Sequence, residues 1–378
     1  MAIPNQQPLA AKESSQKPQL KVIPLRIFKF LLFVLVLVVG FSLVSLSMSR
    51  LFGIEGRLGF LPCLDEPSSL NLWMRPPRNL MHGMTDEELI WRASLVPQVK
   101  DYPFKRVPKV AFMFLTKGPL PLYPLWEKFL RGNEKLYSIY IHSLPSYSAE
   151  FPKSSPFYGR QIPSQVSAWG EMSMCDAERR LLANALLDIS NQRFVLLSET
   201  CIPLVNFSLV HRHLLRARHS FVSSFDDHGP YGRGRYNPRM APEVDISQWR
   251  KGSQWFEVDR QAAIAIIKDT TFYPKFKEFC RPNCYVDEHY FPTMLSIEMP
   301  QRLANRSVTW VDWSRGGAHP ATFGGADITE AFLRGVLEGQ SCLYNGQPSA
   351  LCFLFARKFS PSTLPRLLEL APKVLGFG

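Results

Sequence analysis

Residues 109–142, which read KVAFMFLTKGPLPLYPLWEKFLRGNEKLYSIYIH, decide the fold. The runs 109–116 and 136–142 have the length and composition of buried strands, and the WEKFLRG segment between them is helix-like. Gly118 and Pro119 end the first run. A strand, a helix and a second strand in this order predict a βαβ unit, which is typical of an α/β domain.

The residues that follow extend this pattern. Residues 177–191 repeat apolar side chains at helical spacing, and residues 194–197 (FVLL) predict a third buried strand that ends at Ser198 and Glu199. Residues 219–225 predict a fourth. Because strand ends in open α/β sheets commonly border ligand crevices, we expect a binding site at this edge.

The N-terminal part predicts a membrane anchor. Residues 30–49 (FLLFVLVLVVGFSLVSLSMS) are uncharged and about long enough to cross a bilayer core. The lysine-rich residues 1–29 predict a cytosolic tail, which sends the rest of the chain to the lumenal side in a type II orientation. A cleaved signal peptide is the alternative, but the preceding tail is long and the apolar run exceeds a usual signal core.

Residues 50–108 are punctuated by proline and arginine and predict a stem. It ends in a short helix at 85–96, where Thr85 and Glu88 form a capping box. We expect one folded lumenal domain over residues 109–378, about the size of a single catalytic unit.

The net charge is +12, and the first fifty residues hold six bases and one acid, which leaves +7 beyond the anchor. This excess suits an anionic substrate such as a nucleotide sugar, while the scattered arginines argue against nucleic acid. The 46% hydrophobic content predicts a sizeable core and excludes a largely disordered chain.

Seven cysteines cannot all pair within one chain, and a lumenal domain favours oxidation of some. Cys342 and Cys352 flank an Asn-Gly turn and are disulfide candidates for a small hairpin. Cys280 and Cys284 form a disulfide with each other or elsewhere, or bind zinc with His289, although a second close ligand pair is missing. Two N-x-S sequons would accept glycans in the lumen, at Asn206 and Asn305.

Residues 249–293 hold the densest clustering of aromatic, ionisable and cysteine residues, so we expect the catalytic site there. A strand at 253–258 leads into a helix that Asp259 caps. Glu288, just after the turn at 280–284, is our first candidate for a general base. In the alternative interpretation Asp287 is only a helix N-cap and Glu288 a first-turn residue.

Six motifs in order resemble the core-2/I-branching glycosyltransferase family, most closely its plant branch of anchored Golgi proteins. They are Trp169-Gly170, AERRLL (177–182), FVLLSETCIP (194–203), GSQWF (252–256), DEH (287–289) and ARKF (356–359). The resemblance covers nearly all of residues 109–378. It implies a GT-A-like α/β fold, a UDP-sugar donor, a glycan acceptor, inversion at the anomeric carbon and no divalent metal or other cofactor.

The family's general base falls on Glu288, and its phosphate-binding lysine falls on Lys358. A fixed cation replaces the metal that other enzymes use to neutralise the departing UDP. Animal relatives carry a second phosphate-binding arginine shortly before the cysteine that corresponds to Cys352, and here that stretch reads GQPSALC. We expect Arg357, Arg315 or His319 to take over its role, or the role to be lost.

Further substrate-binding candidates are Ser253, Trp255 and Asp287, together with the GPYGRGRYNPR loop (229–239), which is either structural or contacts acceptor or phosphate. A metal-dependent transferase that uses Glu257 and Asp259 is the alternative enzyme, although no DxD triplet is present. A non-catalytic glycan-binding or scaffold protein that keeps the fold is the alternative outside enzymes. The transferred sugar stays open among N-acetylglucosamine, glucuronic acid and xylose.

Overall fold

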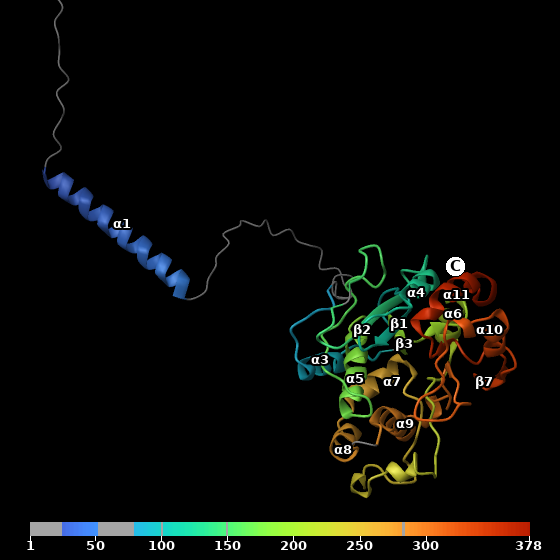
Figure 1. The fold of residues 1–378 in the computed structure, drawn as a ribbon. Helices are drawn as coiled ribbons and strands as arrows, with labels where there is room; N and C mark the ends of the chain where they lie inside the picture. The colour runs from blue at the N-terminus through green and yellow to red at the C-terminus, as the bar shows by residue number, and fades with distance from the viewer. Residues whose placement is uncertain (1–24, 52–78, 100, 149, 282–283) are drawn as a thin grey trace, which may run out of the picture. The chain divides into compact units, whose positions relative to one another are not determined.

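The computed structural model describes residues 25–51, 79–99, 101–148, 150–281 and 284–378, which fall into two compact parts, 1–68 and 69–378 (Figure 1). The helices are α1 (Leu25–Leu51), α3 (Asp86–Ser94), α4 (Tyr123–Leu130), α5 (Met172–Leu186), α6 (Phe207–Arg216), α7 (Arg260–Lys268), α8 (Phe272–Phe279), α9 (Val286–Glu298), α10 (Glu330–Leu337) and α11 (Leu364–Leu370). The strands are β1 (Lys109–Leu115), β2 (Tyr137–His142), β3 (Asn191–Ser198), β4 (Ile202–Pro203), β5 (Glu257–Asp259), β6 (Thr309–Val311), β7 (Cys342–Tyr344), β8 (Gln347–Ser349) and β9 (Phe355–Arg357).

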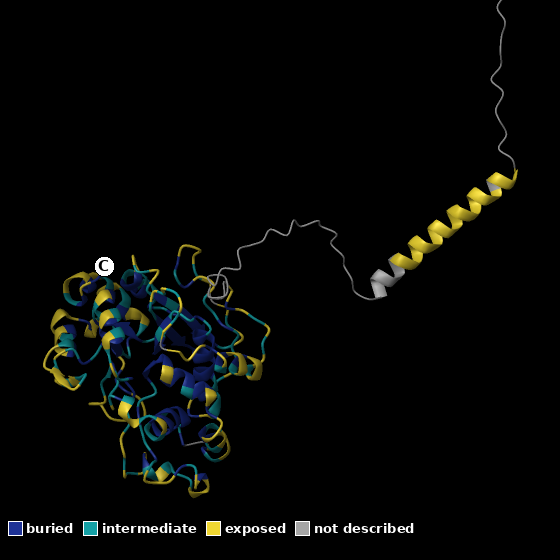
Figure 2. Cartoon of the chain, turned by 180° about the vertical axis from the view of Figure 1, so that it is seen from behind, coloured by how far each residue is buried: buried dark blue, intermediate teal, exposed yellow. Residues whose placement is uncertain are grey.

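Helix α1 is the described element of the first part. Its residues 25–45 have a mean hydropathy of 2.8, and those whose burial is described are all exposed; Figure 2 shows the helix exposed along its described length. A helix of 27 residues is about 40 Å long, which is enough to cross a bilayer. The expected span 30–49 lies within α1 and fits a membrane anchor, whereas most of the expected tail and about half of the expected stem lie outside the described residues.

A four-stranded sheet in the order β2-β1-β3-β5 forms the centre of the second part. Strand β1 is parallel to both β2 and β3, as the βαβ pattern predicts, and β5 closes one side in antiparallel direction. Leu115 pairs with His142 on one side and with Ser198 on the other. The carboxyl ends of all three parallel strands therefore meet at one edge of the sheet.

Alternation along the strands builds a core on each face of the sheet. In β1, Ala111 and Met113 face the cluster that contains residues of α5, α7 and α9. Phe112 and Phe114 face the cluster that contains residues of α4, α6 and α11. Both faces are thus covered by helices in a mixed α/β fold, and Figure 2 shows the buried strands between them.

Two small sheets complete the second part. Strand β9 lies between β4 and β6, and its Phe355 stacks on Trp126 of α4 with ring centroids 6.0 Å apart. Strands β7 and β8 form the expected hairpin around Asn345 and Gly346, both of which have a positive φ.

The folded part begins before residue 109, which corrects the expected stem boundary. Thr85 and Glu88 form the expected capping box at the start of α3. Leu89 and Ala93 of this helix, however, are 1% and 0% exposed within the core cluster of α5 and α7. Since apolar side chains buried this fully are part of a core, α3 belongs to the folded domain.

Two strand expectations need correction. Residues 253–258 form no continuous strand; β5 begins at Glu257 and has three residues. Residues 219–225 make only isolated bridges, at Ser220, Phe221 and Phe225. Both segments lie at the side of the sheet next to β3, where, among the described strands, only β5 pairs with β3 and Phe221 bridges to Glu257.

Candidate active site

A cavity of about 850 Å³ opens at the edge where the parallel strands end. It is lined by residues that follow β1 and β3, by the first turn of α9 and by the end of β9. This is the usual place of a ligand in an open α/β sheet. The seven candidate catalytic and substrate-binding residues all line it: Ser253, Trp255, Asp287, Glu288, His319, Arg357 and Lys358.

Glu288 lies in the first turn of α9 with its side chain 29% exposed. Its Oε2 accepts a hydrogen bond from Lys251 Nζ at 2.5 Å and lies 3.5 Å from Arg235 Nη1. Among the described residues, none donates to Oε1. The two cations therefore orient the carboxylate and leave one oxygen open to the cavity.

The backbone around Gly252 fixes the position of Lys251. Lys251 and Phe225 exchange two backbone hydrogen bonds of 2.9 Å, and Gly252 N–H donates to the carbonyl of Glu288 at 2.8 Å. A Cβ at Gly252 would lie 2.0 Å from the carbonyl oxygen of Ser223. Only glycine allows this close approach, which explains the glycine of the GSQWF motif.

Tyr285, and not Asp287, occupies the N-cap position of α9, so the interpretation of Asp287 as a cap is wrong. Asp287 is buried, and its Oδ1 has no partner among the described residues. Burial and the negative charge of Glu288 raise its pKa from 3.8 to about 7. Glu178, which accepts a hydrogen bond from Gln254, is also buried, and burial followed by repulsion from Asp287 raises its pKa.

Positive charge gathers near the end of β9. The guanidinium of Arg357 lies 4.1 Å from the centroid of the Trp255 ring, which favours a cation–π contact. Burial, followed by repulsion from Arg357, lowers the pKa of the Lys358 ammonium. His319 is exposed, and its ring centroid lies 4.9 Å from that of Trp169. Partial desolvation, followed by repulsion from Lys358, lowers its pKa.

The charges that line the cavity favour an anionic ligand. Its acids are Glu199, Asp287 and Glu288, whereas its bases, apart from His319, are Lys117, Lys251, Arg306, Arg357 and Lys358. An excess of bases attracts an anion more strongly in a concave site than on a flat surface, because the walls of the cavity focus the electric field.

The carboxylates of the metal-dependent alternative lie elsewhere. Glu257 is fully buried and binds Arg193 through two hydrogen bonds of 2.6 Å. Asp259 caps α7, as expected, and also accepts from Arg302. Neither residue lines the cavity, so this alternative metal site is wrong.

The zinc interpretation is also wrong, because Cys280 and Cys284 form a disulfide with each other. His289 is buried and stacks on Trp249 with ring centroids 4.6 Å apart. A second disulfide joins Cys342 to Cys352 and closes the β7–β8 hairpin.

Lys251 and Arg235 contact Glu288 without having been candidates. Lys251 directly precedes the GSQWF motif, and Arg235 belongs to the glycine and arginine loop 229–239. The sequence therefore marked the segments that carry these two residues, but not the residues themselves. Arg315 does not line the cavity. Of the sequon asparagines, Asn206 caps α6 and is half-buried, whereas Asn305 is exposed on the cavity wall.

Comparison with known proteins shows the family of the chain. Residues 110–337 match the family described as Core-2/I-Branching enzyme. Over 309 residues the chain is 36% identical to a protein of Oryza sativa subsp. japonica named Glycosyltransferase BC10. The matched region covers 70% of this chain and 76% of that protein. The chain therefore belongs to the core-2/I-branching enzyme family and is a glycosyltransferase.

Proposed function

We propose that the protein transfers a sugar from a UDP-sugar to a hydroxyl of a glycan acceptor, with inversion and without a metal ion. The observation that carries this proposal is one cavity that holds a cation-oriented carboxylate, Glu288, together with a separate group of cations around Lys358. Such a transfer requires two kinds of group: a carboxylate that accepts a proton, and cations that bind the nucleotide phosphates.

In the proposed step, Oε1 of Glu288 takes the proton of the acceptor hydroxyl while the hydroxyl oxygen attacks C1 of the donor sugar. The bond between C1 and the diphosphate oxygen breaks on the opposite face, so a single displacement inverts the anomeric carbon. The electron pair of that bond leaves with UDP, whose added negative charge Lys358 and Arg357 stabilise. Ser253, Trp255, Asp287 and His319 form the walls that position the two substrates.

The carboxyl ends of β1 and β3 at the cavity support a GT-A-like arrangement, with the nucleotide bound at this edge. Lysines on the N-terminal side of α1 and two disulfides in the second part support a type II Golgi protein whose catalytic part is lumenal. Asn206 and Asn305 are then glycan acceptors; Asn305 is the more accessible.

A non-catalytic glycan-binding or scaffold protein is the second candidate. It is favoured by residues 345–351, the described stretch before Cys352, which contain no base at the place where animal relatives carry a phosphate-binding arginine. Such a protein would bind a glycan without releasing UDP from any donor.

The experiment uses the full chain in detergent micelles with radiolabelled UDP-N-acetylglucosamine, UDP-glucuronic acid and UDP-xylose, and plant glycan extracts as acceptors. We expect transfer from one donor to survive EDTA and to fall about 10²- to 10⁴-fold in Glu288→Gln, with UDP affinity unchanged. Glu298→Gln, at the far end of α9, is the matched control. If Glu288→Gln leaves the transfer rate unchanged, Glu288 is not the general base. If EDTA abolishes transfer, the enzyme depends on a metal ion. If no donor is turned over but the protein still binds glycan, the non-catalytic glycan-binding or scaffold protein is supported.

A further inference from the structure

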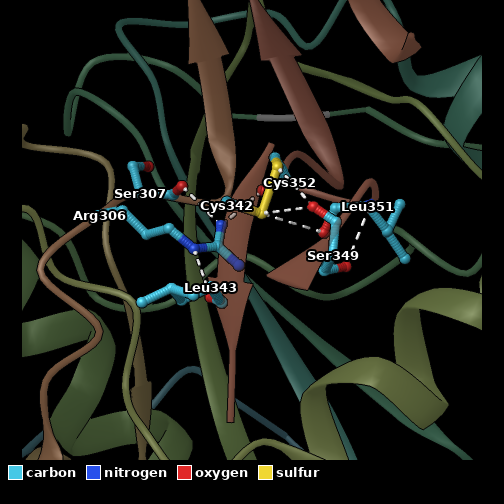
Figure 3. Close-up of a disulfide and its surroundings, with 7 residues drawn as sticks. All are labelled: Arg306, Ser307, Cys342, Leu343, Ser349, Leu351 and Cys352. Atoms are coloured by element: carbon cyan, nitrogen blue, oxygen red, sulfur yellow. Dashed lines mark hydrogen bonds between the residues drawn. A yellow bond between two sulfur atoms is a disulfide. The ribbon is translucent and has the colours of Figure 1, made fainter. Parts of the chain in front are cut away.

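The hairpin that lacks a base is held by an arginine from outside it. Arg306 donates to the carbonyl of Cys352 at 2.6 Å and to that of Leu343 at 3.3 Å, as Figure 3 shows beside the disulfide. Its Nη2 is shielded from solvent and has no hydrogen-bond partner among the described residues, and the guanidinium carbon lies 4.6 Å from the Phe221 ring centroid. Arg306 is therefore engaged in holding the hairpin, although it reaches the cavity wall.

Of the three expected substitutes, Arg315 does not line the cavity and Arg357 is held in place by packing. Arg315 lies 5.7 Å from the Phe323 ring centroid and outside the cavity lining. Arg357 lies over Trp255, and burial lowers the pKa of its guanidinium. His319 lines the cavity, but its lowered pKa disfavours the charged form of the ring. A flexible cation that acts at the diphosphate beside Lys358 and the fixed Arg357 therefore comes from another segment.

Lys117 follows β1 at the edge where the cavity opens. Its turn is fixed, because Thr116 N–H donates to the His142 carbonyl and Thr116 Oγ1 donates to the Gly118 carbonyl, both at 2.9 Å. The Lys117 side chain is exposed and lines the cavity. Among the described residues it has no hydrogen bond or ion pair, so its ammonium is available to a ligand.

Lys117 also lies within electrostatic range of the β9 cations. Its charge contributes to the lowered pKa of Lys358 and to that of His319. Among the described residues, Glu199 is the carboxylate that opposes this repulsion at Lys358. Cations that repel one another without enough counter-charge gain most when an anion enters between them.

We propose that Lys117 and Lys358 together bind the diphosphate of the donor, with Lys117 taking the place of the arginine that the hairpin lacks. This inference rests on the proposed function, because it assigns a second cation to the same donor site. The two lysines come from the ends of two different strands, so they contact the diphosphate from separate directions. Their flexible stems suit a phosphate as point charges.

The test is calorimetric titration of the full chain in detergent micelles with UDP, UMP and uridine. The variants are Lys117→Ala, Lys117→Arg and Lys358→Ala. Lys135→Ala is the matched control, an exposed lysine just before β2, at the opposite edge of the sheet. We expect Lys117→Ala to weaken UDP about tenfold or more, as the loss of a charged phosphate contact predicts, with a smaller effect on UMP and none on uridine.

Lys117→Arg should retain most of the UDP affinity, Lys358→Ala should resemble Lys117→Ala, and Lys135→Ala should resemble the wild type. Unchanged UDP affinity in Lys117→Ala, beside a loss in Lys358→Ala, overturns the role of Lys117 alone. An equal loss of uridine binding also overturns it, since a phosphate contact does not act on the nucleoside. Absence of UDP binding in the wild type overturns the donor site and the proposed function with it.

Discussion

Replacing Glu257 by glutamine tests whether this carboxylate is structural. Glu257 is fully buried, and its two oxygens accept from Nε and Nη2 of Arg193, whose side chain is 3% exposed. Burial outweighs the attraction of Arg193 and raises the pKa of Glu257. The pair therefore adds little net stability, but removing one partner leaves a buried charge without compensation.

Breaking a buried pair costs about 3 to 5 kcal/mol, and we expect the lower end for glutamine because it keeps one acceptor oxygen for Arg193. The folded part has about 300 residues, so its unfolding entropy is about 0.6 kcal/mol per kelvin. A loss of about 3 kcal/mol then lowers the melting temperature by about 5 °C. In Arg193→Met/Glu257→Leu most of the loss should be recovered, because neither charge remains buried.

The assay is thermal and urea denaturation followed by circular dichroism. Glu330→Gln is the control: its pair with Arg334 is about half exposed and should be worth less than about 0.5 kcal/mol. A Glu257→Gln protein with unchanged stability would refute the reasoning.

Three other substitutions test the site and the structure that supports it. Because the pKa of Asp287 is about 7 in the folded chain against 3.8 when free, its charge destabilises the fold increasingly as pH rises from 4 to 7. Asp287→Asn should therefore be more stable than the wild type, by nothing below pH 4 and by at most about 4 kcal/mol above pH 7. Urea titrations at several pH values measure this difference, and a difference that does not change with pH would contradict the prediction. Cys342→Ser should cost about 2 to 3 kcal/mol in urea denaturation, as a loop closed over ten residues predicts. Reduction of the wild type, which also opens the Cys280–Cys284 disulfide, should cost at least as much. Gly252→Ala should lower both the melting temperature and transfer, since its Cβ would clash with Ser223, whereas Gly335→Ala, where no atom lies within 4 Å, should change neither or stabilise α10 slightly.

The sequence predicted those features that depend on neighbours along the chain. The βαβ unit, the capping box at Thr85, the Asp259 cap and the hairpin around Asn345 follow from local periodicity and turn chemistry. Contacts between distant segments carry no such local signal, so the burial of α3 and the pairing of Glu257 with Arg193 were not foreseen. Glu288 was a candidate from the local clustering of residues as well as from the family resemblance, and Lys358 came from the resemblance. The approach of Lys251 to Glu288 required the fold.

The pairing of β9 with β4 and β6 has a consequence for how the protein acquires activity. Lys117, Glu288 and Lys358 reach one cavity from positions spread over most of the folded part, so no short fragment of the chain contains all three. During synthesis the segment that carries Lys358 emerges late, and Phe355 must then find Trp126, which was made more than two hundred residues earlier. Because such non-local contacts form slowly, donor binding is a stringent measure of complete folding.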